Sequence, residues 1–186
     1  MNEVIQNILN RRSVRVYKEE QIKQEDLDLI LKAGYYAPSG CNLQPWHFTV
    51  IQNKELLKTL NTEAKKEFIN SDREMFRKMA ENEQHDIFYN ALTVIVMSGE
   101  KTSNTALIDC SAATQNMMLA AESLGIGSCW IGLLAFLFRS PRVSEFAQIL
   151  KIPEGYEPYF GLTLGYKKYE NGSSPKRREG VITYIK

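Results

Sequence analysis

One segment, residues 104–124, constrains the fold of this chain most strongly, because it is predicted to be a long helix of small and apolar residues. Small side chains let neighbouring elements approach the helix closely, and two pairs of alanines supply them: Ala112, Ala113, Ala120 and Ala121. We expect this helix at the centre of the molecule or at a subunit interface. Gly125 follows it, in the position of a C-terminal cap.

The remaining elements are separate helices and strands without regular βα alternation, which favours an α+β fold in a single domain, residues 1–186. Residues 91–97 form a continuous apolar run and are predicted to be a strand buried on both faces. Apolar periodicity, β-branched content and turn residues predict the other elements. Helices are expected at 3–10, 24–36 and 142–150, one or two polar surface helices within 53–83, and strands at 46–51, 128–133 and 158–166.

The last apolar segment, residues 181–185, is predicted to be extended. It follows a polar loop and has no hairpin partner nearby in the sequence. An arm that reaches across to a second subunit would explain it.

Composition argues against several classes of protein. The 186 residues carry a formal net charge of only +1, whereas a nucleic-acid binder usually has a broad basic face. No apolar run has membrane-spanning length, and the N-terminus lacks a signal-peptide pattern. Three cysteines without a CxxC pair, and only two histidines, favour reduced thiols over disulfides or a metal site. We therefore expect a cytoplasmic protein with no nucleic-acid or membrane partner.

Two compact basic clusters lie at opposite ends of this nearly neutral chain: Arg11-Arg12-Ser13-Val14-Arg15 and Pro175-Lys176-Arg177-Arg178. Guanidinium groups match phosphate in geometry, and lysine adds a point charge. We predict that both clusters converge on one phosphate group. The alternatives are a solvated helix end for the first cluster and a solvated tail for the second.

A loop rich in turn-forming residues, residues 37–45, is the second candidate site. Gly40 would let the backbone approach a ligand, and Asn42 and Gln44 offer both donors and acceptors, as a flat heterocycle requires. The alternative is a plain turn before a strand. We interpret Cys41 as a small filler and His47 as structural.

The segment Leu124–Gly132 contains a GxG, but these glycines follow a helix. A dinucleotide-binding fingerprint needs a strand, then glycines, then a helix, so this is not one. The glycines are better suited to letting a strand lie against a planar ligand.

Taken together, these motifs resemble the nitroreductase family of FMN-dependent oxidoreductases, in the family's order from Arg11 to Arg178. The resemblance implies a central, mostly antiparallel sheet flanked by helices, with the C-terminal segment exchanged across a homodimer. It implies that the first motif and the C-terminal pair hold the FMN phosphate and ribityl chain. The loop, largely from the partner subunit, and the segment at residues 129–132 would lie beside the flavin. The implied cofactor-binding residues are Arg11, Arg12, Ser13, Arg15, Pro38, Ser39, Gly40, Asn42, Gln44, Trp130, Ile131, Gly132, Lys176 and Arg178.

The implied activity is hydride transfer from NAD(P)H through FMN to a nitroaromatic, quinone or related small-molecule acceptor by a ping-pong mechanism. Catalytic chemistry would be carried by FMN, which agrees with the lack of any nucleophilic or metal motif. Some family members carry an acidic residue where this chain has Gly132, so no substrate preference transfers. Enone reduction, flavin reduction, reductive dehalogenation, a non-catalytic flavin sensor and a nucleic-acid module remain alternatives.

Overall fold

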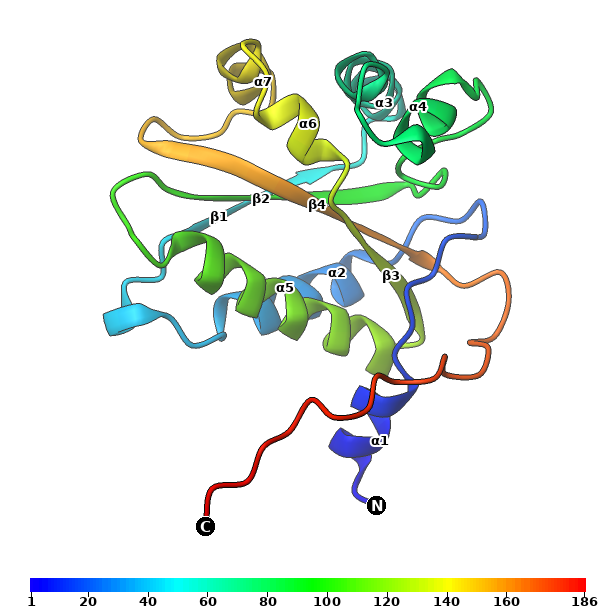
Figure 1. Cartoon of the computed structure of the whole chain (residues 1–186), viewed down its shortest axis with the longest axis vertical. Helices are drawn as coiled ribbons and strands as arrows, with labels where there is room; N and C mark the ends of the chain where they lie inside the picture. Colours follow the sequence, from blue (N-terminus) through cyan, green and yellow to red (C-terminus); the bar gives the residue numbers. More distant parts are fainter.

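The computed structural model describes residues 1–186 and consists of one antiparallel sheet covered by helices on both faces (Figure 1). The strand order is β1-β2-β4-β3, and every neighbouring pair is antiparallel. This architecture confirms the predicted α+β fold with a central antiparallel sheet. The strands are β1 Trp46–Ile51, β2 Thr93–Glu100, β3 Ile126–Ile131 and β4 Tyr156–Tyr166.

Strand β2 has no polar alternation because both of its faces are covered. Val94 and Val96 belong to the hydrophobic core on one side of the sheet, while Ile95 and Met97 belong to the core on the other side. Successive side chains of a strand point to opposite faces, so two cores require an unbroken apolar run. The prediction of a strand buried on both faces is confirmed.

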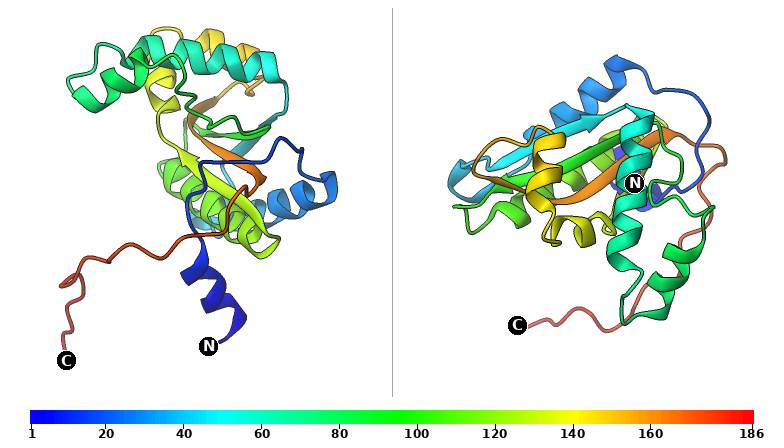
Figure 2. Two further views of the ribbon diagram at one scale, coloured as in Figure 1. Left: turned by 90° about the vertical axis from the view of Figure 1, so that its right-hand side faces the viewer. Right: turned by 90° about the horizontal axis from the view of Figure 1, so that it is seen from above.

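Helices α2 (Gln24–Tyr35) and α5 (Ala106–Ser123) cover one face, as Figure 1 and the left view of Figure 2 show. Their close contact depends on Gly34, where an added Cβ would lie 2.2 Å from the Met117 methyl carbon. Asn116 Nδ2 also donates to the Ala33 carbonyl at 3.1 Å. Helix α5 confirms the predicted long helix.

The other face is covered by α3 (Lys54–Phe68), α4 (Glu74–Glu81), α6 (Leu134–Phe138) and α7 (Val143–Ile149). Phe68, Phe76 and Phe136 meet there, with ring centroids 5.3–6.4 Å apart. One or two surface helices were predicted within 53–83, and the structure has two, α3 and α4. The sequence missed α6, because periodicity cannot separate a five-residue apolar helix from a strand.

Several predicted boundaries were wrong. The strand predicted at 128–133 begins at Ile126, which pairs with Tyr166, and ends at Ile131. Gly132 instead starts the turn into α6, where its carbonyl accepts from the Ala135 amide at 3.0 Å. The strand predicted at 91–97 runs from Thr93 to Glu100, and the one predicted at 158–166 starts at Tyr156. Strand pairing, which local sequence does not display, sets these limits.

The two ends of the chain project from this body (Figures 1 and 2). Helix α1 (Glu3–Asn10) has no buried residue and exposes four large apolar side chains: Val4, Ile5, Ile8 and Leu9. Residues 172–186 are exposed and form no strand or helix. Exchange of this segment between subunits stays a prediction. None of the helices is long and apolar enough to cross a membrane.

Replacing Phe68 with alanine should lower the free energy of unfolding by about 3–5 kcal/mol, because Phe68 is fully buried between α4 and α6. Chemical denaturation measures this loss. The neighbouring Ile69→Ala variant is the control: Ile69 is 40% exposed, so its loss should stay below about 1 kcal/mol. Equal losses in the two variants would contradict this packing.

Candidate functional site

The first basic motif is fixed to the sheet because the chain after it pairs with strands β3 and β4. The Val14 amide donates to the Ser128 carbonyl at 2.9 Å, and the Lys18 amide donates to the Tyr166 carbonyl at 2.9 Å. The contact requires Gly127, where an added Cβ would lie 2.8 Å from the Val14 side chain. The segment thus becomes an extension of the sheet at its β3 edge.

Tyr17 fixes the same segment through its hydroxyl group. Its hydroxyl donates to the Val14 carbonyl at 2.7 Å and lies 2.8 Å from Thr163 Oγ1. Gly165 makes room for its ring, since a Cβ there would lie 2.7 Å from it. Burial raises the pKa of the Tyr17 phenol, so the hydroxyl remains a donor across the physiological pH range.

The guanidinium groups of this motif are only partly used by the protein itself. Arg12 Nη1 donates to the carbonyls of Leu9 (2.7 Å) and Arg11 (2.8 Å), at the C-terminus of α1. In contrast, Arg11 Nη1 and Arg12 Nε are buried and have no hydrogen-bond partner. Buried donors are nearly always paired, so this site fits an added acceptor, and phosphate oxygens suit guanidinium best.

Arg15 lies between β3 and the turn that precedes β2. Its guanidinium carbon is 5.7 Å from the centroid of the Tyr89 ring. Burial raises the pKa of the nearby Cys129 thiol, an effect that the positive charge of Arg15 opposes. Because the thiol stays protonated, Cys129 is a packing residue here and not a nucleophile.

The end of β3 presents a flat, open surface. Trp130 is 36% exposed and stacks on Phe160 with ring centroids 4.0 Å apart, while Ile131 is buried. At Gly132 an added Cβ would meet no atom within 4 Å. The prediction that this segment faces a planar ligand is compatible with these features and stays a prediction.

The loop that contains Pro38, Ser39 and Gly40 has an unusual backbone conformation. Cys41, Asn42 and Gln44 all have positive φ values, between 50° and 56°. Such backbone is unfavourable for residues other than glycine and persists only where surrounding contacts hold it.

Hydrogen bonds to side chains help to hold this loop. The Gln44 amide donates to Ser39 Oγ at 3.0 Å, and Gln44 Nε2 donates to Asn42 Oδ1 at 3.2 Å. The Gly40 amide donates to the carboxylate of Asp109, 3.2 Å away on α5. Sequence reasoning missed this anchoring role; the signal was a single acidic residue in the first turn of an apolar helix.

The structure does not bring the loop and the basic motif together within one chain. The loop is attached to the first turn of α5, whereas α1 contacts its last turns, where Asn7 Nδ2 donates to the Leu119 carbonyl at 2.9 Å. Figure 1 shows the two at opposite ends of α5. The 18 residues of α5 span roughly 27 Å at 1.5 Å per residue.

Lys176 and Arg178 lie in the exposed tail, where Lys176 pairs with Glu179 at 3.3 Å. No hydrogen bond or ion pair links either residue to the first motif. Their convergence on one phosphate stays a prediction.

The start of the tail, however, is fixed beside the first motif by a largely buried ion pair and an amide side chain. The Glu122 carboxylate accepts from Lys167 Nζ at 2.9 Å and from Asn171 Nδ2 at 2.8 Å. Asn171 Nδ2 also donates to the carbonyl of Asn10, the residue before Arg11. Figures 1 and 2 both show the tail passing the end of α1. No local sequence pattern indicates this clamp, because Glu122 lies 45 residues before Lys167 and 49 before Asn171.

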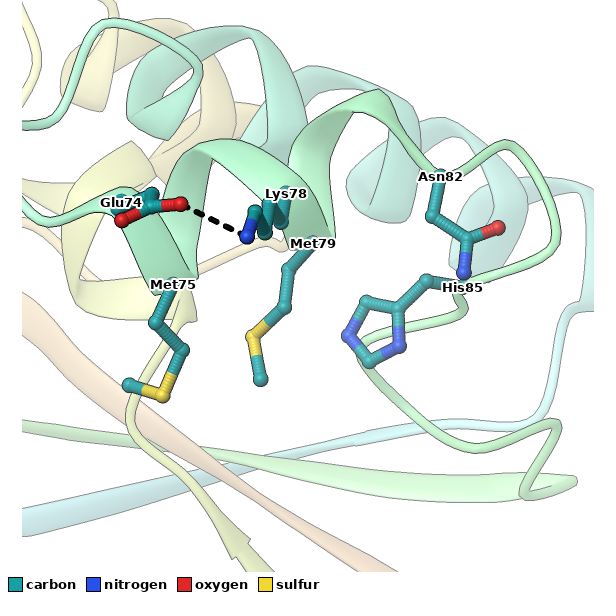
Figure 3. A pocket seen from close by; sticks show the side chains of 6 residues that line it. All are labelled: Glu74, Met75, Lys78, Met79, Asn82 and His85. Carbon is teal, nitrogen blue, oxygen red and sulfur yellow. Dashed lines mark ion pairs between the residues drawn. The ribbon is translucent and has the colours of Figure 1, made fainter.

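A pocket of about 500 Å³ is formed by α4 and the turn that follows it. Figure 3 shows Met75, Met79 and the ring of His85 lining it, next to an ion pair between Glu74 and Lys78. Asn82 completes the lining. We call it the methionine pocket.

His85 connects the methionine pocket to the basic motif. Its ring lies 6.1 Å from the Tyr89 ring, which in turn contacts Arg15. Burial, together with the charge of Lys65, lowers the pKa of His85, so the ring is neutral at pH 7. Its Nε2 atom is buried without a partner.

Comparison with known proteins places this geometry in a family. The sequence model of the nitroreductase family matches residues 8–166. A nitroreductase from Bacteroides fragilis, solved with bound FMN, is 39% identical and superposes with a TM-score of 0.91. The match covers 100% of both chains. One from Desulfitobacterium hafniense, also with bound FMN, is 33% identical with full coverage of both chains and a TM-score of 0.90. An FMN reductase (NADPH) from Bacillus subtilis is 26% identical over 95% of this chain and 70% of its own length.

The chain therefore belongs to the nitroreductase family. The resemblance predicted from its motifs is confirmed, while the roles of the individual site residues stay predictions.

Removing the Glu122 carboxylate should loosen the clamp. In Glu122→Ala, Lys167, with only 12% of its side chain exposed, loses its partner. We expect the free energy of unfolding to fall by about 3 kcal/mol. Chemical denaturation tests this, and Lys66→Ala, which breaks an exposed pair with Glu63, should cost less than about 1 kcal/mol. A Glu122→Met, Lys167→Met double variant should recover most of the loss; if it does not, desolvated charge is not the cause.

Proposed function

We propose that this chain forms a homodimeric, FMN-dependent enzyme that passes hydride from NAD(P)H through bound FMN to a nitroaromatic, quinone or related acceptor. The observation that carries the proposal is the pair of buried guanidinium nitrogens without partners, held at the sheet edge of a nitroreductase-family chain. FMN is the cofactor and NAD(P)H the co-substrate. The enzyme works in the cytoplasm, in keeping with its free cysteines.

The phosphate of FMN is assigned to the first motif. Arg11 Nη1 and Arg12 Nε would each gain an acceptor, and Ser13, which is exposed beside them, adds a hydroxyl. Lys176 and Arg178 would complete the phosphate site. They lie in the tail, and the contacts of Glu122 and Asn171 hold the start of that tail next to Asn10.

A second copy of the chain supplies the remaining contacts. The loop with Ser39, Gly40, Asn42 and Gln44 is separated from the basic motif by the length of α5, so one FMN cannot touch both in one chain. Two chains with their α5 helices antiparallel bring the loop of each against the motif of the other. The exposed apolar side chains of α1 and of residues 181–185 support such an interface.

Bound FMN supplies reversible hydride acceptance, and the protein positions it. Arg15 lies near the end of β3, where its charge stabilises an anion on the neighbouring ligand. Trp130 and Gly132 leave one open face, so co-substrate and acceptor would use it in turn. That order of events is the ping-pong mechanism.

The methionine pocket is the proposed acceptor site. Thioethers of Met75 and Met79 favour contact with flat aromatic rings, and they adapt to different shapes. The neutral ring of His85 lines the same pocket and would donate from a protonated ring nitrogen to a quinone or nitro oxygen after a small rotation. A polarizable lining of this kind suits an enzyme that accepts several acceptors.

The decisive test is anaerobic reduction of the purified protein. NADH or NADPH should bleach the absorbance of the bound flavin, and menadione or nitrofurazone should restore it. Bleaching without recovery by any acceptor would favour the flavin sensor. Recovery by an enone or a halogenated phenol, and not by quinones, would favour the other reductive reactions.

Replacing Arg11 and Arg15 together with alanine should abolish FMN retention. The loss of two charge-assisted contacts should raise the dissociation constant of FMN at least a hundredfold, as measured by flavin fluorescence. Gel filtration should still show a dimer. Arg139→Ala, at an exposed arginine outside the site, is the control, and unchanged FMN binding in the double variant would show that the phosphate lies elsewhere.

Replacing Met75 and Met79 with serine should raise KM for a quinone about fivefold, because two thioether–ring contacts are lost. The KM for ferricyanide, which has no ring, should change less than twofold. Steady-state rates with each acceptor measure the difference. Leu29→Ser, on the exposed face of α2, is the matched control. Equal changes for both acceptors would remove the methionine pocket from the acceptor site.

A further inference from the structure

A second cavity, of about 900 Å³, opens between the segment after the basic motif, the first turns of α3 and the turn before β2. We call it the basic pocket. Its charged lining consists of Arg15, Lys18, Lys54, Lys58, Lys168, Glu19 and Asp86.

The basic pocket carries more net positive charge than the whole chain. Five cationic side chains and two carboxylates give it a net charge of about +3, whereas the whole chain carries +1. None of its four lysines forms an ion pair within the chain. The N-terminal end of α3, at Lys54, adds the positive end of a helix dipole. A concave surface of this charge attracts multivalent anions.

The walls of the basic pocket are rigid on the side of the sheet. The Lys18 amide donates to the Tyr166 carbonyl at 2.9 Å, and the Lys168 amide donates to the Val16 carbonyl at 3.2 Å. Both lysines therefore project from paired backbone, on opposite strands of one short ladder. Lys54 and Lys58 face them from successive turns of α3.

Two residues join the basic pocket to the proposed active site. Arg15 belongs both to the basic motif and to this lining, and His85 lines both this cavity and the methionine pocket. A ligand with a reacting ring at the flavin and phosphates some distance away could therefore occupy both cavities. Reduced nicotinamide dinucleotides have that shape, and their phosphates are distinct from the FMN phosphate at Arg11.

We propose that the basic pocket binds the phosphates of the nicotinamide co-substrate, including the 2′-phosphate of NADPH, and so makes the enzyme prefer NADPH to NADH. This rests on the proposed function, because it assumes hydride transfer from a dinucleotide. Lys54 and Lys58 are specificity residues in this assignment, and they touch no part of the reacting centre.

The test uses the double variant Lys54→Glu, Lys58→Glu, which reverses two charges on α3. Both side chains are exposed and glutamate has a helix propensity similar to lysine, so the variant should fold. Anaerobic stopped-flow bleaching of the flavin, at increasing dinucleotide concentration, gives the dissociation constant. That for NADPH should rise about tenfold and that for NADH less than threefold. The same charge change at Lys23, the N-cap residue of α2, and at Lys32 on that helix (Lys23→Glu with Lys32→Glu) should leave both values within twofold.

A competition experiment distinguishes specific binding of the 2′-phosphate from general attraction of anions. The nucleotide 2′,5′-ADP should compete with NADPH in the native protein and lose this effect in the α3 variant, while 5′-AMP should compete weakly in both. Equal weakening of NADH and NADPH, or no competition by 2′,5′-ADP, would overturn the assignment. If neither dinucleotide bleaches the native flavin and dithionite does, the proposed function itself fails.

Discussion

The pairing of residues 13–18 with the edge of the sheet is the interaction on which the site depends. Two isolated bridges, at Ser13 and Tyr17, fix this stretch to the sheet, and Gly127 and Gly165 leave space for Val14 and Tyr17. Arg11 and Arg15 are then held at fixed places above β3, and Arg11 keeps a buried donor without a partner. A phosphate site built on sheet backbone is more rigid than one on a free loop.

Helix α5 then sets the distance between the two halves of the site. Asp109 in its first turn holds the loop at Gly40, and Glu122 in its last turn holds the start of the C-terminal tail. Because a helix is stiff, this separation cannot close within one chain. Under the proposed function, a second subunit would complete the active site, and it would cover the apolar side chains that both termini expose in one chain.

Local sequence predicted the elements whose signals are local. The buried strand β2, the long helix α5 and its glycine cap were recognised from composition and periodicity, and Gly125 has a φ of +73° as the cap requires. The ends of β3 and β4 were misplaced because pairing across the sheet decides them. The methionine pocket was missed altogether, since its members come from a helix and a turn with ordinary composition.

By itself, the sequence determined the family and the α+β class, because contiguous motifs with distinctive chemistry identify them. Only the tertiary structure decided which groups are left without partners and which cavities they share. Asp109, Glu122 and the lysines of the basic pocket are ordinary charged residues in the sequence. Their roles depend on neighbours more than ten residues away in the chain, and no local pattern encodes these contacts.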